Sequence, residues 1–169
     1  MKIPLVCALA AGLCVSCAAA RPQAGGQPAG RQVGYPQNPA ISPDGSAIVF
    51  TFAGDLWSVS AAGGSARRIT THPAEEGRSA FSPDGTMLAF ESDRDGGRSI
   101  YSMPVRPSAL GKEFGDVRRV TIADRAHSLS AFSHDGTHVY FSSNHEPAIF
   151  RGVKMYRAPI NADGPIRAI

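Results

Sequence analysis

The sequence predicts an all-β protein built from three copies of one four-stranded antiparallel unit. Asp44, Asp84 and Asp135 each follow a short apolar segment and precede a glycine, the pair that favours a tight hairpin turn. After each turn, β-branched and aromatic residues fill short stretches typical of strands. No stretch repeats its apolar residues with the 3.6-residue period of a helix.

The spacing of these repeats predicts the architecture. The segments share the pattern Ala-x-Ser-x-Asp-Gly, and their aspartates are 40 and 51 positions apart. A period near forty residues is the length of one four-stranded propeller blade. We therefore predict a partial β-propeller of about three blades, the last incomplete. The predicted blades span about 38–72, 78–121 and 128–169.

Each repeat is expected to contain the same strands in the same order. The first strand leads into the Asp-Gly turn. The second strand is expected at 47–52, 87–91 and 138–142, the third at 55–59, 99–104 and 154–159, and the fourth at 66–70, 117–121 and 165–169. One aromatic residue recurs in the third strand, which indicates packing between neighbouring blades rather than ligand stacking. These aromatic residues are Trp57, Tyr101 and Tyr156.

Two insertions lengthen the repeats. Residues 105–116 are expected to form a loop between the third and fourth strands of the second repeat. Residues 144–153 are expected to form a loop between the second and third strands of the third repeat. Long insertions at the turns of a repeat scaffold often contact ligands, and they are also common as neutral decoration. The sequence leaves both alternatives open.

The first twenty residues have the composition of an export signal. Lys2 supplies a positive start, Ile3–Val15 is an uncharged run too short to span a bilayer comfortably, and small residues follow at Ser16–Ala20. We expect residues 1–20 to be a signal peptide for export to the periplasm or cell envelope. The Gly-, Pro- and Gln-rich residues 21–37 are expected to be a flexible linker.

All three cysteines, Cys7, Cys14 and Cys17, lie in the predicted signal peptide. Cleavage after Ala20 would leave a chain with no cysteine and therefore no disulfide. Alternatively, Val15-Ser16-Cys17 resembles the end of a lipobox, although Cys14 stands where that motif usually has leucine. Cys17 is therefore a candidate lipidation site, and the expected membrane contact is limited to this anchor.

The charge pattern argues against a nucleic-acid partner. The net charge is +3, and basic residues occur as scattered pairs, such as Arg67-Arg68 and Arg118-Arg119, rather than as one clustered stripe. No glycine-rich phosphate loop opens a helix, and no cofactor is expected. The expected partner is a peptide or a protein.

No catalytic or metal-binding motif is identified. His134 and His138 are four positions apart, which would suit a metal pair on a helix. Here His134 occupies the proline position of the turn and His138 begins a strand, so the helical geometry is missing. A serine nucleophile would need a Gly-x-Ser-x-Gly elbow or a comparable setting, and none is present. We expect no catalytic residue and no metal site.

Two polar segments are candidate contacts at a rim of the propeller. Asp93, Arg94 and Asp95 follow the second strand of the second repeat, where they would form either a charged ligand-binding cluster or a surface turn with a local ion pair. His145 and Glu146 lie in the 144–153 insertion, where they would either contact a ligand or belong to a solvated loop.

The repeats resemble the PD-type propeller repeats of TolB-like and tricorn-like proteins over about residues 38–169. The resemblance rests on the Asp-Gly turn, the aromatic third strand and the Arg-Arg-hydrophobic-Thr fourth strand. The segments GDLWSVSAAGGSARRITTHP and FSPDGTMLAFESDRDGGRSIYSMPV are most similar to exported tricorn-like serine peptidases of the C-terminal-processing class. In that family a propeller precedes PDZ and peptidase domains, which implies a substrate-recognition or gating role. This chain lacks the PDZ and peptidase sequence, so no catalytic residue carries over.

Other functions remain open. A TolB-like envelope scaffold would bind proteins without catalysis, although only a short linker precedes the first blade here. Exported amidohydrolases and prolyl-oligopeptidase-like enzymes share the repeat with a different partner domain. Because a propeller typically closes as a ring of about four to eight blades, three blades leave two open faces. We expect either a longer natural protein or self-association through these faces.

Overall fold

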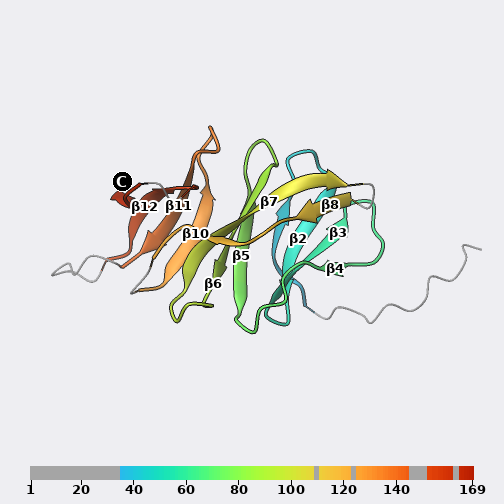
Figure 1. Cartoon of the computed structure of the whole chain (residues 1–169), viewed down its shortest axis with the longest axis horizontal. Coiled ribbons are helices and arrows are strands. Elements are labelled where there is room, and N and C mark those ends of the chain that lie inside the picture. The colour runs from blue at the N-terminus through green and yellow to red at the C-terminus, as the bar shows by residue number, and fades with distance from the viewer. Residues whose placement is uncertain (1–34, 109–110, 123–124, 145–151, 162–163) are drawn as a thin grey trace, which may run out of the picture. The chain divides into compact units, whose positions relative to one another are not determined.

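A computed structural model of the chain describes residues 35–108, 111–122, 125–144, 152–161 and 164–169. This part of the chain consists of strands in three antiparallel sheets and contains no helix (Figure 1). The predicted all-β fold is confirmed, and each sheet corresponds to one blade of a partial β-propeller. Among the described residues, no helix is long and apolar enough to cross a membrane.

The strands follow the order of the repeats. Blade 1 contains β1 (Gln37–Ile41), β2 (Ala47–Phe52), β3 (Asp55–Ser60) and β4 (Arg67–Arg68). Blade 2 contains β5 (Glu76–Phe81), β6 (Met87–Ser92), β7 (Ser99–Ser108), β8 (Gly111–Phe114) and β9 (Arg118–Arg119). Blade 3 contains β10 (His127–Phe132), β11 (His138–Ser143), β12 (Lys154–Pro159) and β13 (Arg167–Ala168). Consecutive strands pair in each blade, and in blade 2 both β8 and β9 pair with β7.

Two strand predictions need correction. The fourth strands β4, β9 and β13 are two residues long, because only two residues of each stay in register with the third strand. The insertion at 105–116 is a β-hairpin rather than a loop, with Val105 of β7 opposite Phe114 of β8. Both side chains pack against the core between blades 1 and 2, which gives the hairpin an apolar face to bury. Residues 145–151 of the other insertion lie outside the described residues.

The Asp-Gly turn is built in the same way in all three blades. In blade 1 the Ser42 hydroxyl donates to Oδ1 of Asp44 at 2.6 Å and accepts from the N–H that begins β2 at 3.0 Å. Gly45 has a φ of 67°, a left-handed conformation that favours glycine. The turns around Asp84 and Asp135 repeat these contacts.

The apolar cores lie between neighbouring blades. Strand β6 contributes to both of them, with Leu88 and Phe90 in one and Ala89 in the other. The core between blades 1 and 2 contains Val49, Leu56, Leu88, Phe90, Tyr101, Met103 and Val105. The core between blades 2 and 3 contains Ala89, Ile100, Val120, Leu129, Val139, Phe141, Tyr156 and Ala158. The middle strands of blade 2 are therefore buried on both faces.

The recurring aromatic residues occupy these cores. Tyr101 and Tyr156 are buried and stack on Phe90 and Phe141, with ring centroids 5.9 and 5.8 Å apart. Trp57 holds the same repeat position in blade 1 and is only half-buried. The packing interpretation is thus confirmed for the two tyrosines.

Candidate functional site

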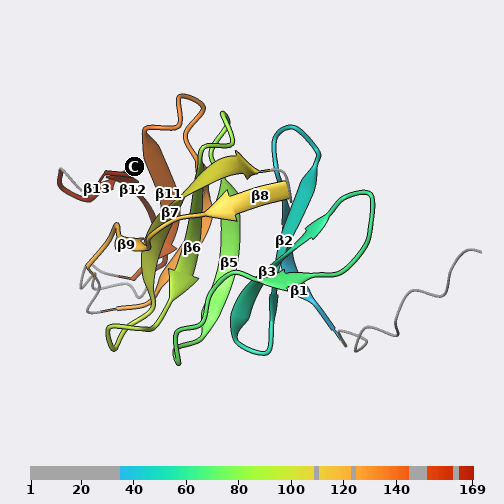
Figure 2. The same cartoon turned by 45° about the vertical axis from the view of Figure 1, so that its right-hand side comes forward.

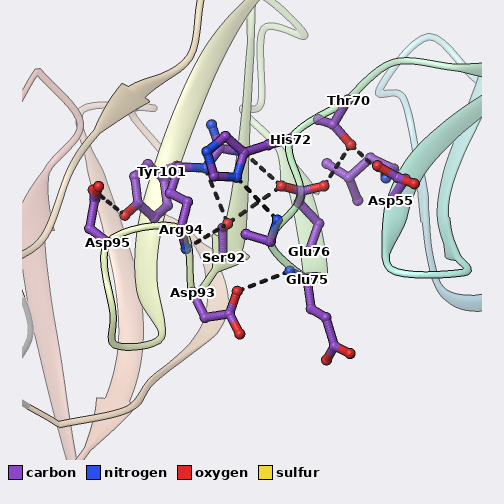
Figure 3. A network of polar contacts seen from close by, with 12 residues as sticks. Asp55, Thr70, His72, Glu75, Glu76, Ser92, Asp93, Arg94, Asp95 and Tyr101 are labelled. Carbon is purple, nitrogen blue, oxygen red and sulfur yellow. Dashed lines mark hydrogen bonds and ion pairs between the residues drawn. The ribbon is translucent and has the colours of Figure 1, made fainter.

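The candidate functional site lies at the rim opposite the Asp-Gly turns. Each Asp-Gly turn joins the first two strands of a blade, so the next turn and the crossing between blades lie at the other end of the strands (Figure 1). In blade 2 this rim carries Asp93, Arg94 and Asp95 in the β6–β7 turn. The crossing from blade 1 places Thr70 and Glu76 close to that turn (Figure 3).

A buried ion pair lies at the centre of this site. The Glu76 side chain is fully buried, the Arg94 side chain is 13% exposed, and Nη2 of Arg94 lies 2.7 Å from Oε1 of Glu76. The second carboxylate oxygen accepts a hydrogen bond from the Thr70 hydroxyl at 2.7 Å. The Ser92 hydroxyl accepts from Nε of Arg94 at 3.1 Å. These charge-assisted hydrogen bonds connect the crossing segment to the β6–β7 turn. We call Thr70, Glu76, Ser92 and Arg94 the blade 1–2 junction.

Aromatic rings support the arginine of this junction. The guanidinium carbon of Arg94 lies 5.3 Å from the ring centroid of Phe90 and 4.9 Å from that of Tyr101. The Tyr101 hydroxyl donates to Oδ2 of Asp95 at 2.6 Å. Burial, and then this hydrogen bond, raise the pKa of Tyr101 to about 12. The phenol therefore stays neutral at ordinary pH.

The structure describes three of the five candidate rim residues. Arg94 binds Glu76, Asp95 accepts from the tyrosine, and Oδ1 of Asp93 accepts from the N–H of Glu75 at 2.9 Å. All three side chains thus contact neighbouring parts of blades 1 and 2. In the described part of the chain, no group of three or more His, Cys, Asp or Glu side chains is arranged to hold a metal ion. Outside the described residues lie His145, Glu146 and Cys17.

A related contact connects blades 2 and 3. In blade 1 the Thr70 hydroxyl accepts from the N–H of Leu56 at 2.9 Å while it donates to the buried carboxylate. In blade 2 the Thr121 hydroxyl accepts from the N–H of Ile100 at 2.9 Å and lies 2.9 Å from Nδ1 of the buried His127. Each threonine therefore links the third strand of one blade to the first strand of the next.

Glu76 and His127 are the functional-site residues that no sequence motif marks. Both lie eight positions before the aspartate of their repeat, and both begin the first strand of a blade. Their partners end the Arg-Arg-hydrophobic-Thr pattern. The shared position is the signal that could have identified them, although the two side chains differ in chemistry.

The junction borders a cleft of about 360 Å³. Arg94 contributes to its wall, together with the crossing segment and the approach to β9. Other lining residues include Ile69, Thr71, His72, Pro73, Asp116 and Val117. Its lining combines apolar residues with polar and charged ones.

Comparisons with known proteins identify the family of this fold. The family model for the tricorn protease N-terminal beta propeller domain matches residues 33–168. The chain belongs to this family. The resemblance to tricorn-like repeats is thereby confirmed, and the three blades are blades of a tricorn-type propeller.

Individual relatives agree with this assignment. Tricorn protease homolog 1 of Streptomyces coelicolor is 33% identical over 78 residues, which cover 45% of this chain and 7% of that protein. The crystal structure of TolB from Acinetobacter baumannii is similar with a TM-score of 0.60 and 23% identity, covering 78% of this chain and 31% of that one. The crystal structure of the tricorn protease is similar with a TM-score of 0.55 and 23% identity, covering 72% of this chain and 12% of that one. This tricorn-type propeller therefore spans less than a third of each of these relatives.

Proposed function

We propose that this chain is an exported propeller module that binds peptides or proteins, and that it forms the substrate-recognition or gating part of a tricorn-like serine peptidase. The observation that carries the proposal is the match of residues 33–168 to the tricorn N-terminal propeller family. The relative from Streptomyces coelicolor, which is named as a tricorn protease homolog, supports the same role.

The geometry of the rim supports polypeptide binding. The 360 Å³ cleft beside Arg94 is lined by apolar residues, among them Ile69 and Val117, and by polar residues such as Thr71, His72 and Asp116. Such a surface offers hydrogen-bond donors and acceptors together with apolar contact, the combination that peptide-binding sites use. Residues 38–169 would provide this module, behind a signal peptide at 1–20 and a linker at 21–37.

Export and anchoring belong to the same proposal. The signal peptide would direct the chain to the periplasm or cell envelope, and Cys17 is the candidate site of a lipid anchor. His145 and Glu146 remain candidate rim contacts for a bound polypeptide, as do Asp93, Arg94 and Asp95.

Peptide binding is tested with fluorescein-labelled peptides from a casein digest, titrated with the chain and followed by fluorescence anisotropy. We expect saturable binding with a Kd below about 1 mM, and no binding of a labelled oligonucleotide of similar length. Linear, non-saturating titrations for every peptide fraction would contradict the proposal.

A further inference from the structure

The outer edges of blades 2 and 3 contain equivalent hollows. Their volumes are about 450 and 320 Å³, and six lining positions of one correspond to six of the other in the repeat. In blade 2 these positions are Met87, Ser102, Pro104, Gly115, Asp116 and Arg118. In blade 3 they are His138, Arg157, Pro159, Gly164, Pro165 and Arg167. We call them the outer hollows.

In blade 1 the surface that corresponds to the outer hollows is occupied by another segment of the chain. The β7–β8 hairpin of blade 2 reaches back to blade 1, as Figures 1 and 2 both show. Nζ of Lys112 lies 2.6 Å from Oδ2 of Asp44, in the Asp-Gly turn of blade 1. The guanidinium of Arg67 donates to the backbone carbonyl of Lys112 at 2.5 Å. The Lys112 side chain is only 12% exposed in this position.

These contacts define a simple recognition chemistry. An arginine of the fourth strand donates to a backbone carbonyl of an extended segment, and the aspartate of the Asp-Gly turn accepts from a lysine of the same segment. Arg118 and Asp84 hold these two positions in blade 2, and Arg167 and Asp135 hold them in blade 3. Among the described residues, no ion pair involves any of these four side chains.

Charge distinguishes the two outer hollows. In blade 3, Arg157 lies directly opposite Arg167 across the strand pair, and two like charges would disfavour a lysine. In blade 2 the position of Arg157 is taken by the neutral Ser102. The two arginines that line this hollow, Arg106 and Arg118, are balanced by the carboxylates of Glu113 and Asp116, whereas no described residue that lines the hollow of blade 3 carries a carboxylate. The outer hollow of blade 2 is therefore the one that suits a basic segment.

We infer that the outer hollow of blade 2 binds an extended, lysine-bearing segment of a partner protein, in the way that blade 1 binds the Lys112 hairpin. Arg118 holds a backbone carbonyl of that segment and Asp84 holds the lysine. The inference rests on the proposed function, since it assigns a site and a chemical preference to polypeptide binding. It concerns a surface at the outer edge of the blade, which adjoins the rim cleft beside Arg94 through Gly115 and Asp116.

The test uses a fluorescein-labelled, backbone-cyclised peptide with the sequence of residues 104–116, titrated with the full chain and followed by anisotropy. We expect saturable binding that weakens about tenfold or more with Arg118→Glu, because a carbonyl-binding guanidinium becomes a carboxylate. Asp84→Asn should also weaken binding, and its amide oxygen still accepts the turn hydrogen bonds. Arg125→Glu is the matched control at an exposed position and should leave the affinity unchanged.

A second probe in which alanine replaces the lysine at position 112 should bind about tenfold more weakly than the first. Equal affinities for the two probes, or equal effects of Arg118→Glu and Arg125→Glu, would overturn the inference. If the hairpin probe fails to bind while casein peptides bind, the inference is wrong and the proposed function stands. If the hairpin probe binds as expected and casein peptides do not, the inference about the outer hollow of blade 2 is supported and the proposed general role in peptide recognition is wrong.

Discussion

Single polar side chains determine how blades 1 and 2 are joined. Glu76 has no contact with bulk water, yet its carboxylate accepts hydrogen bonds from two different segments, through Thr70 and Arg94. Removing one member of such a pair leaves the other charge buried without a partner, which costs more than the pair contributes when complete. The junction is therefore more sensitive to substitution than the exposed charges around it.

The substitution Glu76→Gln tests this junction. The amide keeps the size of the side chain but leaves the guanidinium of Arg94 without its counter-charge. We expect the free energy of unfolding, measured by urea denaturation, to fall by about 3 kcal/mol. Glu75→Gln is the matched control because Glu75 is exposed, and it should change the free energy by less than about 0.5 kcal/mol. Similar values for the two variants would show that the buried pair does not stabilise the junction.

The three turn aspartates predict an acid-dependent loss of stability. Lys112 and the serine hydroxyl hold the pKa of Asp44 below its ordinary value of 3.8, and the serine hydroxyl of each turn does the same for Asp84 and Asp135. A depressed folded-state pKa contributes stability that is fully present above the unfolded value and is lost as the pH falls toward the folded value.

Replacing all three turn aspartates with asparagine should therefore flatten the pH dependence. We expect the free energy of unfolding of the wild type to fall more steeply between about pH 5 and about pH 3 than that of the triple variant. Urea titrations at several pH values in this window measure the difference. Parallel curves for the two proteins would mean that other carboxylates control acid unfolding.

At the scale of elements, the β7–β8 hairpin is the feature that joins blade 2 to blade 1 from the side of the Asp-Gly turns. Its lysine is the largest cause of the lowered pKa of Asp44. With Lys112→Ala we expect the pKa of Asp44, followed by NMR through its side-chain carboxyl carbon, to rise toward 3.8. Asp135 lies in blade 3, where its hydrogen bonds among the described residues are to Ser133 and Thr137, and its pKa should be unchanged in the same spectra. An unchanged pKa of Asp44 would show that the hairpin does not rest on blade 1 in solution.

The strands of the repeats could be predicted from the sequence because turn chemistry and apolar patterning both mark them. The second and third strands agree with the structure to within one residue in blade 1, where β2 covers Ala47–Phe52 and β3 covers Asp55–Ser60. The hairpin at 105–116 could not be predicted. Its proline and glycine residues favour a loop locally, and only the packing of Val105 and Phe114 against another blade stabilises it as strands.

The candidate site was predictable only in part. The sequence predicts Arg94 as a charged residue at a rim, because a cluster of charged residues after a strand indicates an exposed turn. Its partner Glu76 is eighteen positions away, at the start of a strand in which nothing distinguishes a buried carboxylate from an exposed one. Pairing across a blade boundary is a tertiary contact, and local sequence patterns do not contain it.

At the scale of the whole molecule, the open face of blade 3 exposes a repeat position that is buried in the other two blades. Leu56 and Ile100 are fully buried between blades, whereas Met155, at the same repeat position in blade 3, is 41% exposed. Because this surface packs on the next blade in blades 1 and 2, the same surface of blade 3 is suited to packing on a further blade. We therefore propose that the chain self-associates through this face of blade 3.

We expect the sedimentation coefficient of the chain to rise with concentration, and Met155→Asp to suppress this rise. Ile122→Asp is the control, since Ile122 is 77% exposed and does not occupy the equivalent blade position. A concentration-independent sedimentation coefficient for the wild type would rule out association through the open faces under these conditions.

We have proposed that this tricorn-type propeller belongs to a serine peptidase. Sequencing the genomic DNA that follows the codon for Ile169, in all frames, tests it most directly. We expect further repeats of the same type, followed by sequence for a PDZ module and a serine-peptidase domain. Repeats that complete a propeller and then end at a stop codon would contradict the proposal and would indicate a TolB-like binding scaffold instead.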